Sequence, residues 1–239
     1  MIVMPLELSA QAKIVKAVEQ EKKYEWLEAA NSYRQALGID SAQPSSDPKS
    51  WERMGFCYQL ASRQAESTAE FRRLAGFAVK AYRHAGKLWK TKNALDNQGR
   101  SLQEYALAEY VRSGLASSSS KKREILGTSC EFGRKSMEAY RSLRNELDCA
   151  RVASAILPCF FERLYVALDF EEMRSVAHEA IELSNLAIKT LSASEDKAEL
   201  LRAYFTSSLL DWFAANFVEP ETQKELVQTS LSYSEKALE

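Results

Sequence analysis

Apolar residues return every three or four positions along nearly the whole chain, with polar residues between them. In the first such stretch the apolar positions are Ala10, Ile14, Val15, Ala17 and Val18. This spacing places side chains on one face of an α-helix, unlike the alternation that is typical of a strand. We therefore predict helices at residues 8–21, 24–37, 48–62, a long stretch to 90, 101–115, 121–143, 147–168, 170–191, 194–217 and 220–239.

Turn-forming residues mark where several of these helices begin and end. Gly38 follows the last apolar position of the second helix and predicts its end. Residues 39–50 are polar and contain two prolines, so we expect a loop there. Asp47 and Pro48 then predict an N-cap and a first helical position, because Asp can accept an unpaired N–H and Pro has none to offer. Pro158 lies inside a continuous apolar period, where we expect a kink.

One segment carries a more specific signal. Residues Trp51 to Tyr58 fit the spacing W-x2-L-G-x2-Y, with Met54 in the place of the leucine. This is the first-helix signature of a tetratricopeptide repeat. Within it, Gly55 marks the position where the next helix is expected to approach most closely.

The second-helix pattern of the same repeat, A-x3-F-x2-A, also recurs. Two strong versions and three weaker ones begin at residues 29, 78, 136, 180 and 230. Tyr33 and Tyr82 hold the aromatic place in the two strong versions. The chain therefore resembles the tetratricopeptide-repeat family across nearly its whole length. The repeats are longer than the family consensus, and we expect the additional residues to lengthen helices rather than loops.

The resemblance implies an all-α fold: a right-handed superhelical solenoid of about five antiparallel helix pairs, with residues 1–239 as a single domain. The predicted pairs are residues 8–38, 48–90, 98–143, 147–191 and 194–239. Long, irregular pairs of this kind also resemble the soluble NSF attachment proteins, and residues Tyr82 to Trp89 are similar to a signature of that family.

In the tetratricopeptide family the first helices of the pairs line a concave groove. An alignment on Gly55, and a second on Ala106, assign seven positions of this chain to that groove. They are Glu52, Phe56, Gln59, Arg100, Gln103, Leu107 and Tyr110. Their mixed character suits an extended or amphipathic peptide, although the groove can also be closed by a neighbouring helix of the chain. The asparagines with which some members grip a carboxyl terminus are missing here.

Composition and charge exclude several function classes. The formal net charge is −1, from 32 basic and 33 acidic residues, so we expect no nucleic-acid partner. The most apolar windows, residues 153–168 and 200–218, carry charges such as Asp211. We predict that these windows are buried helix faces and that the chain does not insert into a membrane. The start of the chain does not resemble a signal peptide, and four separated cysteines fit a reducing, cytoplasmic location. Cys57 and Cys159 are predicted to be small core residues.

Candidate chemistry is sparse. His84 and His178 are the two histidines, and neither has a partner at the spacing of a catalytic or metal-binding motif. No glycine-rich phosphate loop is present. We therefore expect no enzymatic activity, no metal and no cofactor.

The leading hypothesis is a non-enzymatic scaffold that binds a protein or peptide in its groove. One alternative is a sensory or regulatory module of a longer signalling or transcription-related chain. Another is an adaptor, similar to the NSF attachment proteins, in a membrane-trafficking assembly. The last predicted helix pair has no evident capping helix, so we also consider a homodimer formed through it.

Overall fold

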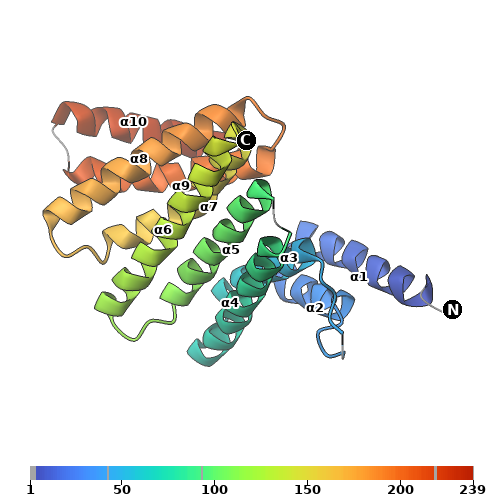
Figure 1. The fold of residues 1–239 in the computed structure, drawn as a ribbon. Helices are drawn as coiled ribbons and strands as arrows, with labels where there is room; N and C mark the ends of the chain where they lie inside the picture. The colour runs from blue at the N-terminus through green and yellow to red at the C-terminus, as the bar shows by residue number, and fades with distance from the viewer. Residues whose placement is uncertain (1–3, 42, 93, 218–219, 239) are drawn as a thin grey trace. The chain divides into compact units, whose positions relative to one another are not determined.

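The computed structural model describes residues 4–41, 43–92, 94–217 and 220–238. These residues form ten α-helices and one short 3₁₀ helix, with no strand among them (Figure 1). The helices are α1 (Met4–Lys22), α2 (Trp26–Ala36), α3 (Pro48–Arg63), α4 (Thr68–Lys90), α5 (Leu95–Ser113), α6 (Ser119–Ser142), α7 (Glu146–Leu164), α8 (Phe170–Ser192), α9 (Lys197–Ala214), η1 (Ala215–Phe217) and α10 (Pro220–Lys236). The prediction of an all-α fold is confirmed.

Capping residues, glycine and proline explain several of the helix boundaries. Asp47 accepts hydrogen bonds from the backbone N–H groups of Lys49 and Ser50, and Pro48 is the first residue of α3, as predicted. Asp169 caps α8 in the same way. Gly38 adopts a φ of +60° just after α2, a conformation that glycine enters at little cost. Helix α7 continues through Pro158 without a loop.

The main difference from the predicted boundaries is at α5. This helix begins at Leu95, within residues 90–98, which we expected to be a connection or a weak helix start before a helix at 101–115. Elsewhere the extra length of the repeats lies in helices: α4, α6 and α8 have 23, 24 and 23 residues. The expectation of long helices with short connections is therefore confirmed for these pairs.

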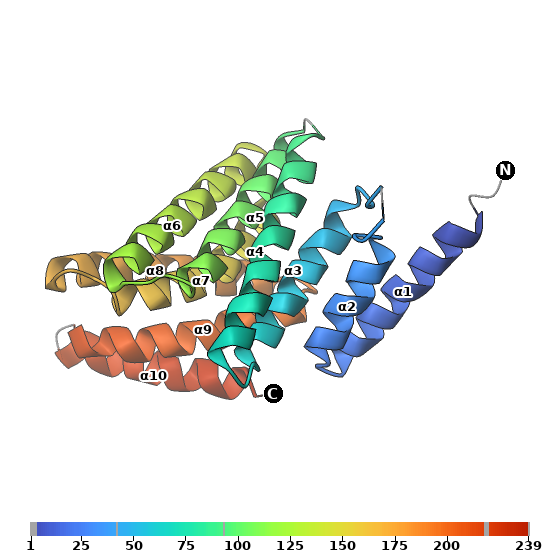
Figure 2. The ribbon, with the colours of Figure 1, turned by 90° about the horizontal axis from the view of Figure 1, so that it is seen from below.

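The chain divides into two compact units, Met1–Leu115 and Ala116–Glu239. In unit 1, each of the helices α1 to α4 packs on the helix that follows it in the chain, so the series ends at α5. Figures 1 and 2 both show α3, α4 and α5 lying side by side. The predicted third pair, residues 98–143, is split between the units, since α5 belongs to unit 1 and α6 to unit 2.

Small residues allow the helices of unit 1 to approach closely. A Cβ atom added to Gly55 of α3 would lie only 3.0 Å from Cδ1 of Tyr82 in α4. The flanking residues Ala78 and Ala85 are fully buried, and Tyr82 is 1% exposed. The close approach predicted at Gly55 is confirmed, and the Ala-Tyr-Ala pattern forms the contact.

Unit 2 is built by the same packing rule. Each of its helices α6 to α10 packs on its neighbour in the chain, and α9 also packs on α7. A Cβ atom on Gly133 of α6 would lie 2.7 Å from Cδ1 of Ile156 in α7, so a larger residue there would force the Ile156 side chain to shift. Tyr140 and Phe160 are buried at 1% and 0% exposure and fill the core.

Candidate functional site

The seven predicted groove residues lie on α3 and α5 of unit 1. Tyr110 is buried, and the other six are half-buried. Two observations show that the residues of α3 and α5 meet. Arg63 donates a hydrogen bond to the Tyr110 hydroxyl at 3.1 Å. Burial raises the pKa of Glu52, and the nearby charge of Arg100 opposes that shift.

Several of these residues are occupied by contacts within the unit. Phe56 packs edge-to-face against Trp26, with ring centroids 5.7 Å apart, and the Arg53 guanidinium lies 4.7 Å above its ring. Gln59 accepts a hydrogen bond of 2.8 Å from the hydroxyl of Tyr82. These side chains therefore stabilise the helix packing, and only their outer edges are accessible to a partner.

An acidic cluster lies under the same face. Glu104 of α5 is 1% exposed, and its Oε2 has no hydrogen-bond partner among the described residues. Burial and the charge of Glu52 raise the pKa of Glu104 well above its usual range, while Arg100 opposes the shift. The Arg100 guanidinium lies 5.3 Å from the ring centre of Trp89. The sequence pattern did not single out Glu104, because only the tertiary packing of the helices makes it an internal residue.

Unit 2 exposes an apolar surface that was not predicted. On α9, Leu201, Phe205, Leu209 and Trp212 are 42%, 61%, 37% and 60% exposed, and they follow one another at helical spacing. We call them the α9 row. The opposite side of α9 is buried in the unit, where Ala203, Leu210 and Ala214 lie among small polar residues and Asp211. The prediction that the window 200–218 is a buried face is therefore wrong for the α9 row.

A cluster of five aromatic rings lies at one end of the same helix. Ring centroids in neighbouring pairs are 5.0–6.1 Å apart. Its members are Phe161, Tyr165, Phe170, Phe213 and Phe217. Tyr165 and Phe170 are 61% and 51% exposed. The other three members are half-buried, so the cluster lies at the surface of unit 2.

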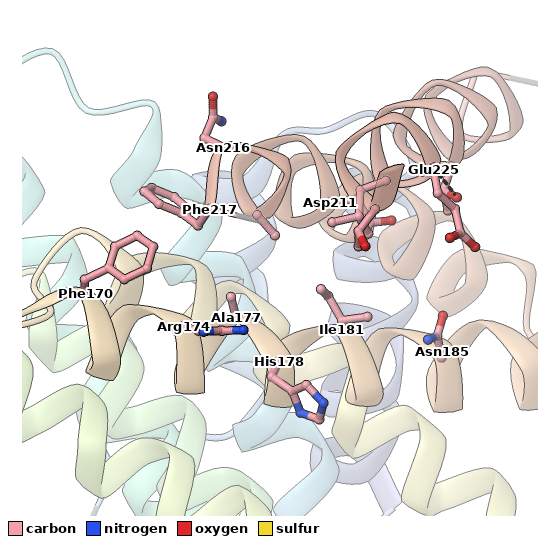
Figure 3. Close-up of a pocket in the computed structure, with 14 residues that line it drawn as sticks. Phe170, Arg174, Ala177, His178, Ile181, Asn185, Asp211, Asn216, Phe217 and Glu225 are labelled. Atoms are coloured by element: carbon pink, nitrogen blue, oxygen red, sulfur yellow. Dashed lines mark hydrogen bonds between the residues drawn. The ribbon is translucent and has the colours of Figure 1, made fainter. Parts of the chain in front are cut away.

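A cavity of about 740 Å³ lies between α8, α9, η1 and α10, and we call it the α8–α10 pocket (Figure 3). Phe170 and Phe217 stand at one end of the view, and Asn185 and Glu225 at the other. Asp211 of α9 and Ile181 of α8 face each other across the pocket in Figure 3. This volume is in the range of small-molecule binding sites.

Asp211 is the chemically distinctive residue of this pocket. It is 3% exposed, and burial raises its pKa to about 7. The sequence did carry a signal for it, namely an acidic residue in the middle of an apolar helix. That signal argued only against a membrane span, because nothing in the local pattern shows which helices surround the carboxylate.

The remaining residues that sequence analysis considered for chemistry pack within the described part of the fold. No group of three or more His, Cys, Asp or Glu side chains in this part of the chain is arranged to hold a metal ion. His84 stacks on Trp51 with ring centroids 4.1 Å apart. Cys57 and Cys159 are buried at 0% and 1% exposure, which confirms their predicted place in the core. Among the described helices, none combines the length and apolar character that crossing a bilayer requires.

Comparison with known proteins assigns the chain to no family: no protein-family model matches it, and no curated protein matches its sequence. The resemblance to tetratricopeptide repeats therefore remains a prediction.

Proposed function

We propose that this chain is a non-enzymatic protein-binding module, with tetratricopeptide-like helix pairs arranged in a right-handed superhelix, and that the α9 row is its main binding surface. The supporting observation is the exposure of four large apolar side chains in one row of a single helix. Exposed apolar side chains that gather in one place are typical of protein interaction sites.

The row has the dimensions of a helix-binding surface. It extends over twelve residues, from Leu201 to Trp212, and the eleven steps between them give a length of roughly 16 Å at 1.5 Å per residue. An amphipathic helix with apolar residues at i, i+4, i+7 and i+11 presents a stripe of about that length. The partner that best fits this surface is therefore an amphipathic helix of another protein.

The predicted groove residues of unit 1 are a second surface within the same proposal. Glu52, Phe56 and Arg100 retain half-exposed edges, and a partner that requires them would bind unit 1. These side chains already have contacts within unit 1, so less of their apolar surface is left for a partner to cover than in the α9 row.

Affinity capture from a cell extract, with the intact chain as bait, compares the two surfaces. We expect Phe205→Asp to lose partners that the unchanged chain and Phe56→Asp both retain. Lys189→Asp, an exposed change at the end of α8, serves as the matched control. The opposite pattern would move the binding surface to unit 1. Equal retention by all variants would refute both surfaces, and turnover of a small molecule by the chain would refute the non-enzymatic assignment.

A homodimer through the C-terminal helix pair is the second candidate. Apolar side chains are exposed on α10 and in the turn that follows it. Val227 and Leu231 of α10 are 37% and 61% exposed, and Leu238 of the turn is 90% exposed. Light scattering at increasing concentration tests it. A dimer that Leu231→Glu converts to a monomer, and that Phe205→Asp leaves intact, would support this assembly, whereas a monomer at all concentrations would exclude it.

A further inference from the structure

The α8–α10 pocket contains a buried carboxylate that lacks a partner. Asp211 is 3% exposed, and none of the described residues gives its side chain a hydrogen bond or an ion pair. Burial is the one cause of its raised pKa, so no neighbouring cation compensates for its charge. A buried charge without compensation is costly, and proteins seldom retain one that nothing binds. The carboxylate therefore either holds a proton or, when it is ionised, is stabilised by a cation that binds beside it.

The rest of the pocket suggests what else the ligand carries. Asn185 and Glu225 lie at the same end as Asp211 and add oxygen acceptors (Figure 3). At the other end, Phe170 and Phe217 form an aromatic wall, with ring centroids 5.8 Å apart. The pocket thus has an acidic end and an aromatic end, which matches a molecule with one cationic head and an apolar body.

We propose that the α8–α10 pocket binds a protonated amine attached to an aromatic or aliphatic body. The ammonium group donates hydrogen bonds to the Asp211 carboxylate, and the body extends between α8 and α9 towards Phe170 and Phe217. This inference concerns a different surface from the α9 row and does not depend on the proposed function. The amine has two sources, a free small molecule or the lysine side chain of a protein partner.

The charged groups around the pocket make the site selective. Arg174 and His178 of α8 line the pocket, as does Glu225 of α10. Tyr233 of α10 lies close enough for the charge of Asp211, together with burial, to raise its pKa. In Figure 3, Arg174 lies nearer to the aromatic end than to Asp211. A second positive charge on the ligand would approach Arg174 and be repelled. We therefore expect monoamines to bind more tightly than diamines of similar length.

Calorimetric titration of the intact chain near pH 8 tests the proposal directly. The probe is 4-phenylbutylamine, and its neutral counterpart 4-phenylbutanol tests the need for charge. A capped Phe-Gly-Lys peptide, compared with its Nε-acetyl-lysine form, represents the protein source. We expect the amine or the lysine peptide to bind and the neutral counterparts to bind at least about tenfold more weakly, as loss of a charge-assisted hydrogen bond requires. Hexane-1,6-diamine is expected to bind more weakly than the monoamine.

Variants identify the residue responsible. Asp211→Asn keeps the shape of the side chain and removes its charge, and we expect it to weaken amine binding about tenfold or more. Glu182→Gln is the matched control, because it also replaces an acidic side chain by its amide. Glu182 is on α8, lies outside the pocket lining and has 69% of its side chain exposed. Unchanged binding by Asp211→Asn, or an equal loss in both variants, would overturn the proposal.

The pH dependence of the unchanged chain provides a second readout that needs no Asp211 variant. Amine binding requires the ionised carboxylate, so affinity should fall as the pH drops through about 7. His178→Gln should retain this dependence. Binding of the small amine alone identifies a metabolite-like ligand, and binding of the lysine peptide alone identifies a protein source. Failure of both to bind, or a pH dependence that disappears with His178→Gln, would overturn the assignment to Asp211.

Discussion

Unit 1 and unit 2 are built from similar helix pairs but differ in what their first helices expose. In unit 1, α3 presents Phe56 and Gln59, which pack on Trp26 and hydrogen-bond to Tyr82. In unit 2, α9 presents Phe205 and Trp212 at 61% and 60% exposure. The same architecture therefore carries one surface with internal partners and another without them.

Their buried acids show a parallel difference. In unit 1, Glu104 and Glu52 share the influence of Arg100, which opposes the effect of burial. In unit 2, Asp211 has no such cation. The side chains of unit 1 that have internal partners stabilise the fold of that unit. The α9 row and Asp211 lack such partners and are available for a second protein or a ligand. We infer that unit 1 is the more self-contained of the two and that unit 2 is the more interactive.

The largest expected effect concerns what the units share. Tyr82 in unit 1 and Tyr140 in unit 2 are both 1% exposed and occupy the aromatic place of the repeat pattern. Replacing either by Ala should lower the free energy of unfolding by about 3–5 kcal/mol, because it removes a buried ring and leaves a cavity. Urea denaturation followed by circular dichroism measures it. A loss below about 1 kcal/mol in either variant would show that the two cores are not equivalent.

The next effect separates the buried acids by pH. The pKa of Asp211 rises from 3.8 to about 7 on folding. Between these two values the folded chain holds a proton on Asp211 that the unfolded chain has lost. The contribution of Asp211 to the free energy of unfolding is therefore complete below about pH 4 and is lost as the pH rises through about 7. Asp211→Asn should remove this loss, which amounts to at most about 4 kcal/mol at pH 8.

Denaturation of the Asp211→Asn variant and the unchanged chain at pH 4, 6 and 8 checks this expectation. The advantage of the variant should grow with pH. A constant difference across that range would mean that Asp211 titrates normally in the folded chain.

A smaller effect tests the cation of unit 1. Arg100→Met should lower stability by about 1 kcal/mol at neutral pH, because Glu52 and Glu104 lose a nearby positive charge. The loss should shrink in acid, where the carboxylates take up protons. Lys92→Met is the matched control, since Lys92 lies over the same Trp89 ring at 4.9 Å. Equal and pH-independent losses in both variants would attribute the effect to the ring contact instead of the carboxylates.

The smallest expected change in stability is at the α9 row. Phe205→Ser should alter the unfolding free energy by less than about 0.5 kcal/mol, because the side chain is already 61% exposed. Thermal denaturation measures it at low protein concentration. Destabilisation comparable to that of Tyr82→Ala would mean that Phe205 belongs to the core and would remove the main support for a binding surface on α9.

Much of the fold followed from local patterns. The start of α3 depended on Asp47 and Pro48, whose capping roles need no distant residue. The contact at Gly55 followed from the repeat signature, because a Cβ atom at this position would press on the Tyr82 ring and force the two helices slightly apart. The beginning of α5 was left undecided, since the polar residues 90–98 fit either a connection or a weak helix start, and the helix begins among them at Leu95.

The sequence by itself determined that this chain forms long helices, where most of them begin and end, and which small and aromatic residues pack between them. Tertiary structure decided which face of α9 is buried, because its neighbours α7, α8 and α10 cover the side that carries Leu210 and Asp211 and leave the α9 row exposed. It also decided the isolation of Asp211. Whether a carboxylate has a partner depends on every group around it, and the surroundings of Asp211 come from the packing of α8, η1 and α10 on α9.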